Sequence, residues 1–191
     1  MASDSDSQSR RALLFSGHMI DAPGRSRPRF PPALEAAVDT AIRSVVDRLQ
    51  PSGDDVAICS GACGGDLLFA EAVLDRGVPI RMYLPFDEAT FLDTSVNFAN
   101  ARWAERFHVV ARKAQRFIAP DMLGRLHDGA DPFERTNQWM LDEALRLGSK
   151  GVSFLCVWNG EGGDGPGGTK HMIDTIRARN GEVNWIDIRT L

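Results

Sequence analysis

Short apolar runs alternate with longer amphipathic segments along almost the whole chain. The runs of strand length include "RALLF" (11–15), "DVAIC" (55–59) and "GVSFLCVW" (151–158). Between such runs, apolar residues recur every three or four positions, as they do over 34–49, and this is the spacing of one buried helix face. The pattern therefore predicts strands and helices in alternation.

The predicted elements define a fold class. Strands are expected at 11–15, 55–59, 78–85, 116–119, 151–158 and 182–188, and helices at 34–49, 66–76, 133–148 and 169–179, with 91–114 mostly helical. Continuously apolar strands that alternate with helices indicate a parallel sheet covered on both faces. We therefore predict an α/β fold, a Rossmann-like three-layer α/β/α sandwich with a mostly parallel sheet of about six strands.

Composition narrows the class of protein. The chain has 191 residues, of which 43% are hydrophobic and 25% charged, as expected for a globular domain. We expect a single domain over 11–191 after a polar, disordered leader at 1–10, and a cytoplasmic protein, because the leader lacks the apolar core of a signal peptide. No apolar run approaches the roughly 18 residues of a membrane span. Three cysteines, an odd number, indicate reduced thiols.

Two glycine-rich loops are the candidate chemistry. "SGACGGD" (60–66) and "NGEGGDGPGGT" (159–169) each follow a predicted strand and lead into a predicted helix. Unpaired N–H groups at a helix start favour an anion, and glycine lets the main chain approach a phosphate. The alternative is that these glycines only form tight turns. Since the carboxyl ends of parallel strands share one edge, both loops should lie there with Ser16-Gly17-His18 and Pro85-Phe86.

Several short motifs together resemble the SLOG superfamily. They are "FSGH" after the first strand, "SGACGGDLLFAEAVLDRG" after the second, "TNQWMLDEAL" on a helix and "GPGGTKHM" near the end. This group of Rossmann-like domains includes the DNA-processing protein A family and the LOG-type phosphoribohydrolases. The match is closest to branches with "GaArGaD", "RNxxML" and "GGT" motifs. The resemblance implies a nucleotide or nucleotide-derived ligand at the glycine loops, in a bacterial sensor or signalling module.

The predicted ligand-binding residues come from the loops and from the "TNQWML" helix. They are Ser16, Gly17, His18, Ser60, Gly61, Gly64, Gly65, Asp66, Arg135, Asn137, Gly167, Gly168 and Thr169. Asn137 is included because the resemblance implies that its family counterpart points to the ligand. Asp66 has alternative readings as a helix cap, a ribose acceptor or a general base. A further cluster, Arg25, Arg27 and Arg29, is read either as a lid over a phosphate or as a solvated loop.

An enzyme is the second hypothesis. The LOG-type signature places a glutamate shortly after "PGGxGT", whereas here Lys170, His171 and Met172 follow "PGGT". Cleavage or transfer at an N-glycosidic bond would need another carboxylate near the anomeric carbon. Asp66, Glu71 and Glu134 are the candidates for that catalytic role.

The expected partner is a nucleotide-derived small molecule, with possible homo-oligomers or attached signalling domains. Single-stranded DNA binding is the third hypothesis, but a net charge of -4 without a long basic run argues against nucleic acid as a partner. No cofactor is predicted. No metal is predicted either, because Cys59 and Cys63 do not form a paired CxxC motif.

Overall fold

The sheet orders its strands around β1. The computed structural model describes residues 10–162 and 167–191. Its strands are β1 (Ala12–Gly17), β2 (Val56–Cys59), β3 (Ile80–Leu84), β4 (Gln115–Ile118), β5 (Val152–Trp158) and β6 (Glu182–Asp187). They form one six-stranded sheet in the order β4-β3-β2-β1-β5-β6, and each neighbouring pair is parallel. The predicted strands and the predicted sheet are confirmed.

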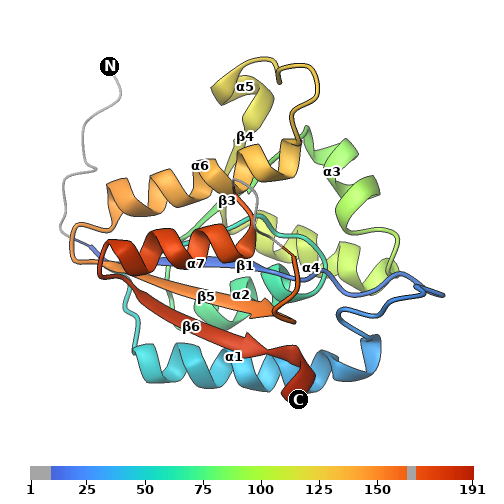
Figure 1. Ribbon diagram of the computed structural model, residues 1–191, viewed down its shortest axis with the longest axis horizontal. Coiled ribbons are helices and arrows are strands. Elements are labelled where there is room, and N and C mark those ends of the chain that lie inside the picture. The colour runs from blue at the N-terminus through green and yellow to red at the C-terminus, as the bar shows by residue number, and fades with distance from the viewer. Residues whose placement is uncertain (1–9, 163–166) are drawn as a thin grey trace.

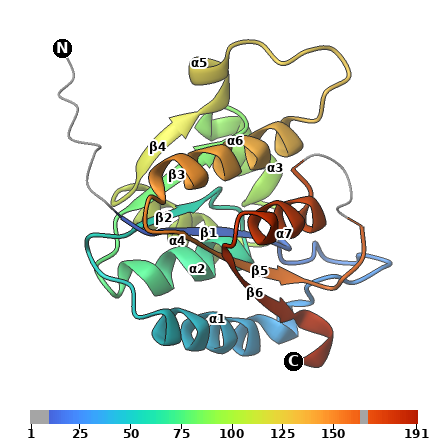
Figure 2. The same cartoon turned by 60° about the vertical axis from the view of Figure 1, so that its left-hand side comes forward.

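Helices cover both faces of this sheet (Figures 1 and 2). They are α1 (Glu35–Leu49), α2 (Gly65–Leu74), α3 (Glu88–Ser95), α4 (Ala101–Ala111), α5 (Ala119–Leu123), α6 (Pro132–Leu147) and α7 (Thr169–Ala178), with short 3₁₀ turns at η1 (Pro32–Leu34) and η2 (Ile188–Thr190). Side chains alternate along a strand, so β1 contributes to two cores. Leu13 and Phe15 pack with α1, α2 and α4, whereas Ala12 and Leu14 pack with α6 and α7. The predicted three-layer sandwich is confirmed.

Two segments differ from the predicted elements. The helical stretch expected over 91–114 is broken at 96–100, because the Asn100 side chain accepts from the Arg102 N–H at 3.1 Å and starts a new helix. The short helix α5 was not predicted. The leader expected at 1–10 lies outside the described residues except for Arg10, whose N–H donates to Ser149 Oγ at 3.2 Å. The domain boundaries stay a prediction.

Two further features are the state of the cysteines and the length and apolar character of the helices. All three cysteines are free and buried, in agreement with the reduced thiols expected from their number. Across residues 10–162 and 167–191, no helix combines the length and the apolar character needed to cross a bilayer.

Candidate functional site at the carboxyl edge of the sheet

Strand order reverses next to β1. From β1 the chain moves outward through β2 and β3 to β4, and it then returns to the other side of β1 to form β5 and β6. In open α/β sheets the loops at such a reversal leave in opposite directions, and ligands bind beyond the carboxyl ends of the strands there. The loops after β1 and β5 are therefore the ones to examine first.

His18 and Asn159 join these two loops. His18 Nε2 lies 3.1 Å from Asn159 Oδ1, and it lies 3.2 Å from the Asn159 backbone nitrogen. The imidazole tautomer decides which contact is the hydrogen bond, since Nε2 either donates to the amide oxygen or accepts from the N–H. Burial lowers the pKa of His18, the side-chain hydrogen bond with Asn159 raises it, and nearby Arg29 lowers it further. His18 is therefore a neutral bridge at pH 7.

The first glycine loop, Ser60–Asp66, is closed by its own aspartate. Asp66 Oδ1 accepts from the Ser60 N–H at 2.9 Å and from the Gly61 N–H at 3.2 Å. Its side chain is buried, which raises its pKa to about 6, while those two N–H groups act in the opposite direction. Ser60 Oγ donates to the Tyr83 carbonyl at 3.1 Å. Two N–H groups that could have bound a phosphate are thus already occupied.

The glycines of this loop face other parts of the protein. A Cβ atom on Gly64 would lie 2.5 Å from the Ile20 nitrogen, and one on Gly65 would lie 2.8 Å from the Phe15 ring. A Cβ on Gly61 would collide with the Met82 side chain. All three glycines are buried. The space made by the missing side chains is filled by protein atoms.

The chain after β1 covers the first glycine loop directly. Met19 and Gly64 form an isolated antiparallel bridge, in which the Ile20 N–H donates to the Cys63 carbonyl at 3.1 Å and the Gly65 N–H donates to the His18 carbonyl at 3.2 Å. The Cys63 N–H donates to the Ser95 carbonyl at 2.9 Å, so the end of α3 holds the loop from another side. This geometry corresponds to the packing role that the sequence left open.

The second glycine loop, Asn159–Thr169, has a different surrounding, and its residues 163–166 lie outside the described part. Gly167 is buried with positive φ, and a Cβ there would collide with the carbonyl of Glu134 at the start of α6. The Gly167 N–H donates to His171 Nδ1 at 3.1 Å. Gly168 and Thr169 are partly buried. The loop thus brings the start of α7 against the start of α6.

The start of α7 differs in its charges from the starts of α2 and α6. Gly168 is its N-cap and makes no side-chain cap, and the first turn contains no acidic residue. By contrast, α2 has Asp66 in its first turn, while α6 has Glu134 there and is capped by Asp131. Unpaired N–H groups and the helix dipole at such an end attract negative charge.

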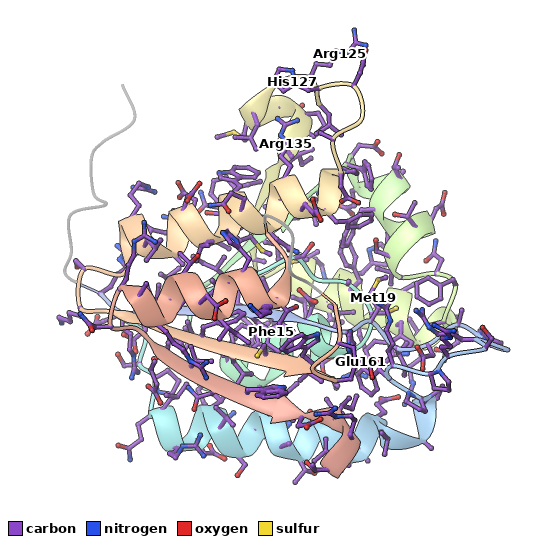
Figure 3. The ribbon with its side chains drawn as sticks, viewed as in Figure 1. Phe15, Met19, Arg125, His127, Arg135 and Glu161 are labelled. Carbon is purple, nitrogen blue, oxygen red and sulfur yellow. The ribbon has the colours of Figure 1, made fainter. Side chains whose placement is uncertain are left out.

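The Arg135 side chain is directed away from these loops. Its Nη2 donates to the Gly124 carbonyl at 2.9 Å. Figure 3 shows Arg135 with His127 and Arg125 at the top of the molecule, whereas Met19 and Glu161 lie lower, near the carboxyl edge. Asn137 is partly buried on the same helix. The main chain just before Arg135 lies against Gly167, but its guanidinium is turned toward Gly124 and away from the predicted phosphate-binding loops.

The three candidate catalytic carboxylates do not converge either. Glu71 faces α4, where its two oxygens accept from Arg106 at 2.7 and 2.5 Å. Asp66 is 5% exposed and holds the first glycine loop. Glu134 is exposed at the start of α6, next to Gly167. Of the three, Glu134 is the one near the second glycine loop.

Two polar residues at the edge were not singled out from the sequence. Asn159 directly follows the most apolar strand, which is the signal that could have identified it. Asp21 had no such signal. Its Oδ2 accepts from the backbone N–H groups of Arg29 and Phe30 at 2.8 and 3.0 Å, and this closes the loop after β1. Arg25 Nε donates back to the Arg27 carbonyl at 3.0 Å, so part of the arginine cluster is folded onto its own loop.

Comparison with known proteins finds likeness in structure. No protein-family model and no curated protein matches the sequence. DNA processing protein A from Streptococcus pneumoniae matches with a TM-score of 0.43 and 12% identity, over 91% of this chain and 58% of that one. DNA processing protein A from Helicobacter pylori matches with a TM-score of 0.37 and 13% identity, over 92% and 75%. The Moco carrier protein from Chlamydomonas reinhardtii matches with a TM-score of 0.35 and 9% identity, over 94% and 91%.

These matches correct one expectation and support another. The argument against nucleic acid as a partner is wrong, because the Helicobacter pylori structure is described by its single-stranded DNA binding mode. Proteins with this likeness thus include a nucleic-acid binder, and the chain spans less than two thirds of the first of them. Likeness at these identities concerns the fold and assigns no ligand. The predicted resemblance to the SLOG superfamily is confirmed as a resemblance of Rossmann-like fold.

Proposed function

We propose that the chain binds a nucleotide-derived small molecule at the carboxyl edge between β1 and β5, as a sensor or signalling module. The observation that carries the proposal is the start of α7, which lies at this edge without a side-chain cap and without an acid in its first turn. Within the described part of the chain, each other helix of eight or more residues has one or the other. The N–H groups of Thr169 and His171 would take the phosphate.

The surrounding charges support an anion. Arg29 acts on His18 in the direction that lowers its pKa, so its positive charge extends to the β1 loop, whereas Arg25 is paired with Asp21, which acts on His18 in the opposite direction. His18, kept neutral by burial, then offers one ring nitrogen as a hydrogen-bond partner for a ribose or base. Asn159 holds that ring in place. The edge thus combines an anion position with a neutral polar group.

Binding without turnover is the better-supported form of the function. The glutamate of the LOG-type signature is replaced in the sequence after "PGGT". Asp66 and Glu71 are occupied by main-chain N–H groups and by Arg106, respectively. A general acid or base must reach the reacting group within hydrogen-bond distance. The arrangement of these two carboxylates therefore favours a binding module over a glycosidase.

The test uses two substitutions at the α7 N-cap. Gly168 has φ -68 and ψ 158, which any residue adopts, so aspartate and asparagine can both cap the helix there. Gly168→Asp adds a negative charge where the phosphate would bind, and Gly168→Asn adds the same cap without the charge. We expect both variants to be at least as stable as the wild type. AMP, ADP-ribose, NAD and cyclic AMP are screened by thermal shift, with mass spectrometry after incubation.

The expected result is a rise in melting temperature with at least one phosphate-bearing probe in the wild type. Gly168→Asp should lower the affinity for that probe about tenfold or more, whereas Gly168→Asn should lower it much less. If Gly168→Asp binds the probe as tightly as the wild type does, the phosphate does not bind at the start of α7. A shift with oligothymidylate and none with the small molecules would replace the proposal by nucleic-acid binding. Release of free base would show an enzyme.

A further inference from the structure

A separate pocket lies under the loop that follows β1. It has a volume of about 430 Å³ and is bounded by that loop, by the start of α1 and by the start of α4. In Figure 1 the loop is the blue segment at the right. The walls are largely apolar, with Ile20 and several prolines, and the polar lining residues include Asp21, Asn100 and Trp103. The glycine loops contribute no residue to this lining.

Trp103, one of the residues that line this pocket, carries an unpaired donor. The residue is fully buried, and its Nε1 has no hydrogen-bond partner among residues 10–162 and 167–191. The Arg106 guanidinium lies 4.3 Å from the ring centroid and is itself held by Glu35 at 2.9 Å and by Glu71, so the indole ring is fixed in place. A buried N–H without a partner destabilises the folded state relative to a satisfied one. An acceptor supplied from outside the chain would remove that destabilisation.

Asp21 brings an unpaired acceptor to the same pocket. Its Oδ2 is used by the backbone N–H groups of Arg29 and Phe30. Its Oδ1 is buried and accepts no hydrogen bond from any residue that the structure describes, although Arg25 Nε lies 3.3 Å away as an ion pair. The pocket therefore has one donor and one acceptor left over on its lining residues. Buried polar groups are otherwise nearly always satisfied in proteins.

The charges around the pocket cancel. Arg102 pairs with Glu35 at 2.6 Å, and Arg25 pairs with Asp21 at 3.3 Å. No net charge is therefore left on these lining side chains to attract an ion, in contrast to the start of α7. A ligand that suits this lining is uncharged, has flat apolar faces for the proline walls, and carries an acceptor and a donor for the two unpaired atoms.

We propose that this pocket is a second binding site, for an uncharged planar nitrogen heterocycle with hydrogen-bond donor and acceptor groups, which is the chemistry of a nucleobase. The ligand accepts from Trp103 Nε1–H and donates to Asp21 Oδ1. Both atoms are covered, so the ligand enters when the exposed segment 22–28 moves outward. A Cβ on Gly24, in that segment, would meet nothing within 4 Å, so the segment is not packed there. The site does not depend on the proposed phosphate site.

The direct test follows the tryptophan indole signals. The chain has four tryptophans, so ¹H-¹⁵N spectra of the full chain contain four indole N–H signals, and Trp103→Phe identifies the one that belongs to Trp103. The probes are uncharged: adenosine, guanosine, cytidine and uridine. We expect at least one of them to saturate the protein and to move the Trp103 signal downfield, as a new hydrogen bond would. A Trp103 signal that does not move with any nucleoside would overturn the proposal.

Variants provide the second measurement. Trp103→Phe should lower the affinity for the nucleoside that binds about fivefold to tenfold, since one hydrogen bond is lost. Trp185→Phe is the matched control, because that indole donates to the Trp158 carbonyl at 3.0 Å, and its affinity should be unchanged. Asp21→Asn keeps an oxygen for the Arg29 and Phe30 N–H groups but presents an amide N–H₂ to the ligand, so it should weaken binding at least as much.

The outcomes separate this site from the proposed phosphate site. Gly168→Asp should leave nucleoside affinity unchanged, and Trp103→Phe should leave the affinity for the phosphate-bearing probe unchanged. If Trp103→Phe and wild type bind the nucleoside equally, the indole N–H is not a ligand contact and the proposal is wrong. Loss of nucleoside binding in Gly168→Asp alone would place the nucleoside at the start of α7 and would overturn the second site.

Discussion

The two glycine-rich loops have similar sequences and different surroundings. The first, Ser60–Asp66, is buried under the main chain of residues 18–20 and closed by the Asp66 carboxylate. The second, Asn159–Thr169, leads into a helix with no carboxylate in its first turn. Glycine content alone does not separate these cases. The first turn of the following helix does, because Asp66 in α2 occupies the N–H groups of Ser60 and Gly61, whereas α7 has no acid in its first turn.

The largest expected effect concerns the packing role of the first loop. Gly64 has φ +101, and an added Cβ would lie 2.5 Å from the Ile20 nitrogen. Gly64→Ala should therefore lower the free energy of unfolding by more than about 3 kcal/mol, through backbone strain and a collision with main chain. Urea denaturation measures the change.

Gly162 is the matched control in the second loop. It also has positive φ, +69, but a Cβ there would meet nothing within 4 Å. Gly162→Ala should lower the free energy of unfolding by only about 1 kcal/mol, which is the cost of placing alanine at a positive φ. Equal losses at the two glycines would remove the distinction between a packed loop and an open one.

A smaller effect is expected from the Asp66 carboxyl. Its pKa is raised to about 6 from 3.8 by burial, so the folded state holds the proton more tightly than the unfolded state does. Its contribution to stability is thus fully present below about pH 3.8 and is lost as the pH rises through about 6. Relative to Asp66→Asn, the wild type should lose on the order of 2 to 3 kcal/mol of unfolding free energy between pH 3.5 and 7. A difference that stays constant across this range would contradict the assigned environment.

Glu71 gives the next effect, on the helix after the first loop. It accepts two hydrogen bonds from Arg106, whose side chain is 18% exposed. Glu71→Gln should cost about 1 kcal/mol of stability, since a charged partner is replaced by a neutral one. The affinity for the phosphate-bearing probe should not change. Glu105→Gln, at an exposed position of α4, is the control and should have almost no effect on either quantity.

The smallest expected effect concerns Asn159, at the start of the second glycine loop. The hydrogen bond with Asn159 raises the pKa of His18, against the larger effect of burial. Asn159→Ala should therefore lower the pKa of His18 below its wild-type value, as followed by an NMR titration of the ring protons. A pKa that rises instead would mean that the ring becomes solvated and that Asn159 mainly keeps water out.

The fold was predictable because each strand and most helices carry a local pattern. In mainly apolar runs such as 152–158, the residues on both faces of the sheet are buried, which is typical of strands in the middle of a parallel sheet. The break at 96–100 was missed because one side chain, Asn100, decides it. The apolar spacing continues across the break through Trp103 and Phe107, both of which are buried.

The grouping of the loops at the carboxyl edge was predictable from the sequence, but their contacts were not. Sheet topology places the ends of all parallel strands at one edge, so the loops at 16–18, 60–66 and 159–169 could be grouped from their order alone. Which N–H groups are already used depends on contacts between distant segments, such as Met19 with Gly64. The pocket between Asp21 and Trp103 depends on two residues that are 82 positions apart (103 − 21) and follow no common spacing.

The pairing of β1 with β5 has a consequence for synthesis. Ala12 pairs with Val152, and His18 meets Asn159, so the carboxyl edge joins residues 12–18 to residues 152–159, which are synthesised much later. A nascent chain that has reached β4 already contains every strand needed for the first glycine loop. The same chain has no α7 and no partner for the outer side of β1. A ligand bound at this edge would therefore act on folding only after β5 and α7 have been synthesised and have joined β1.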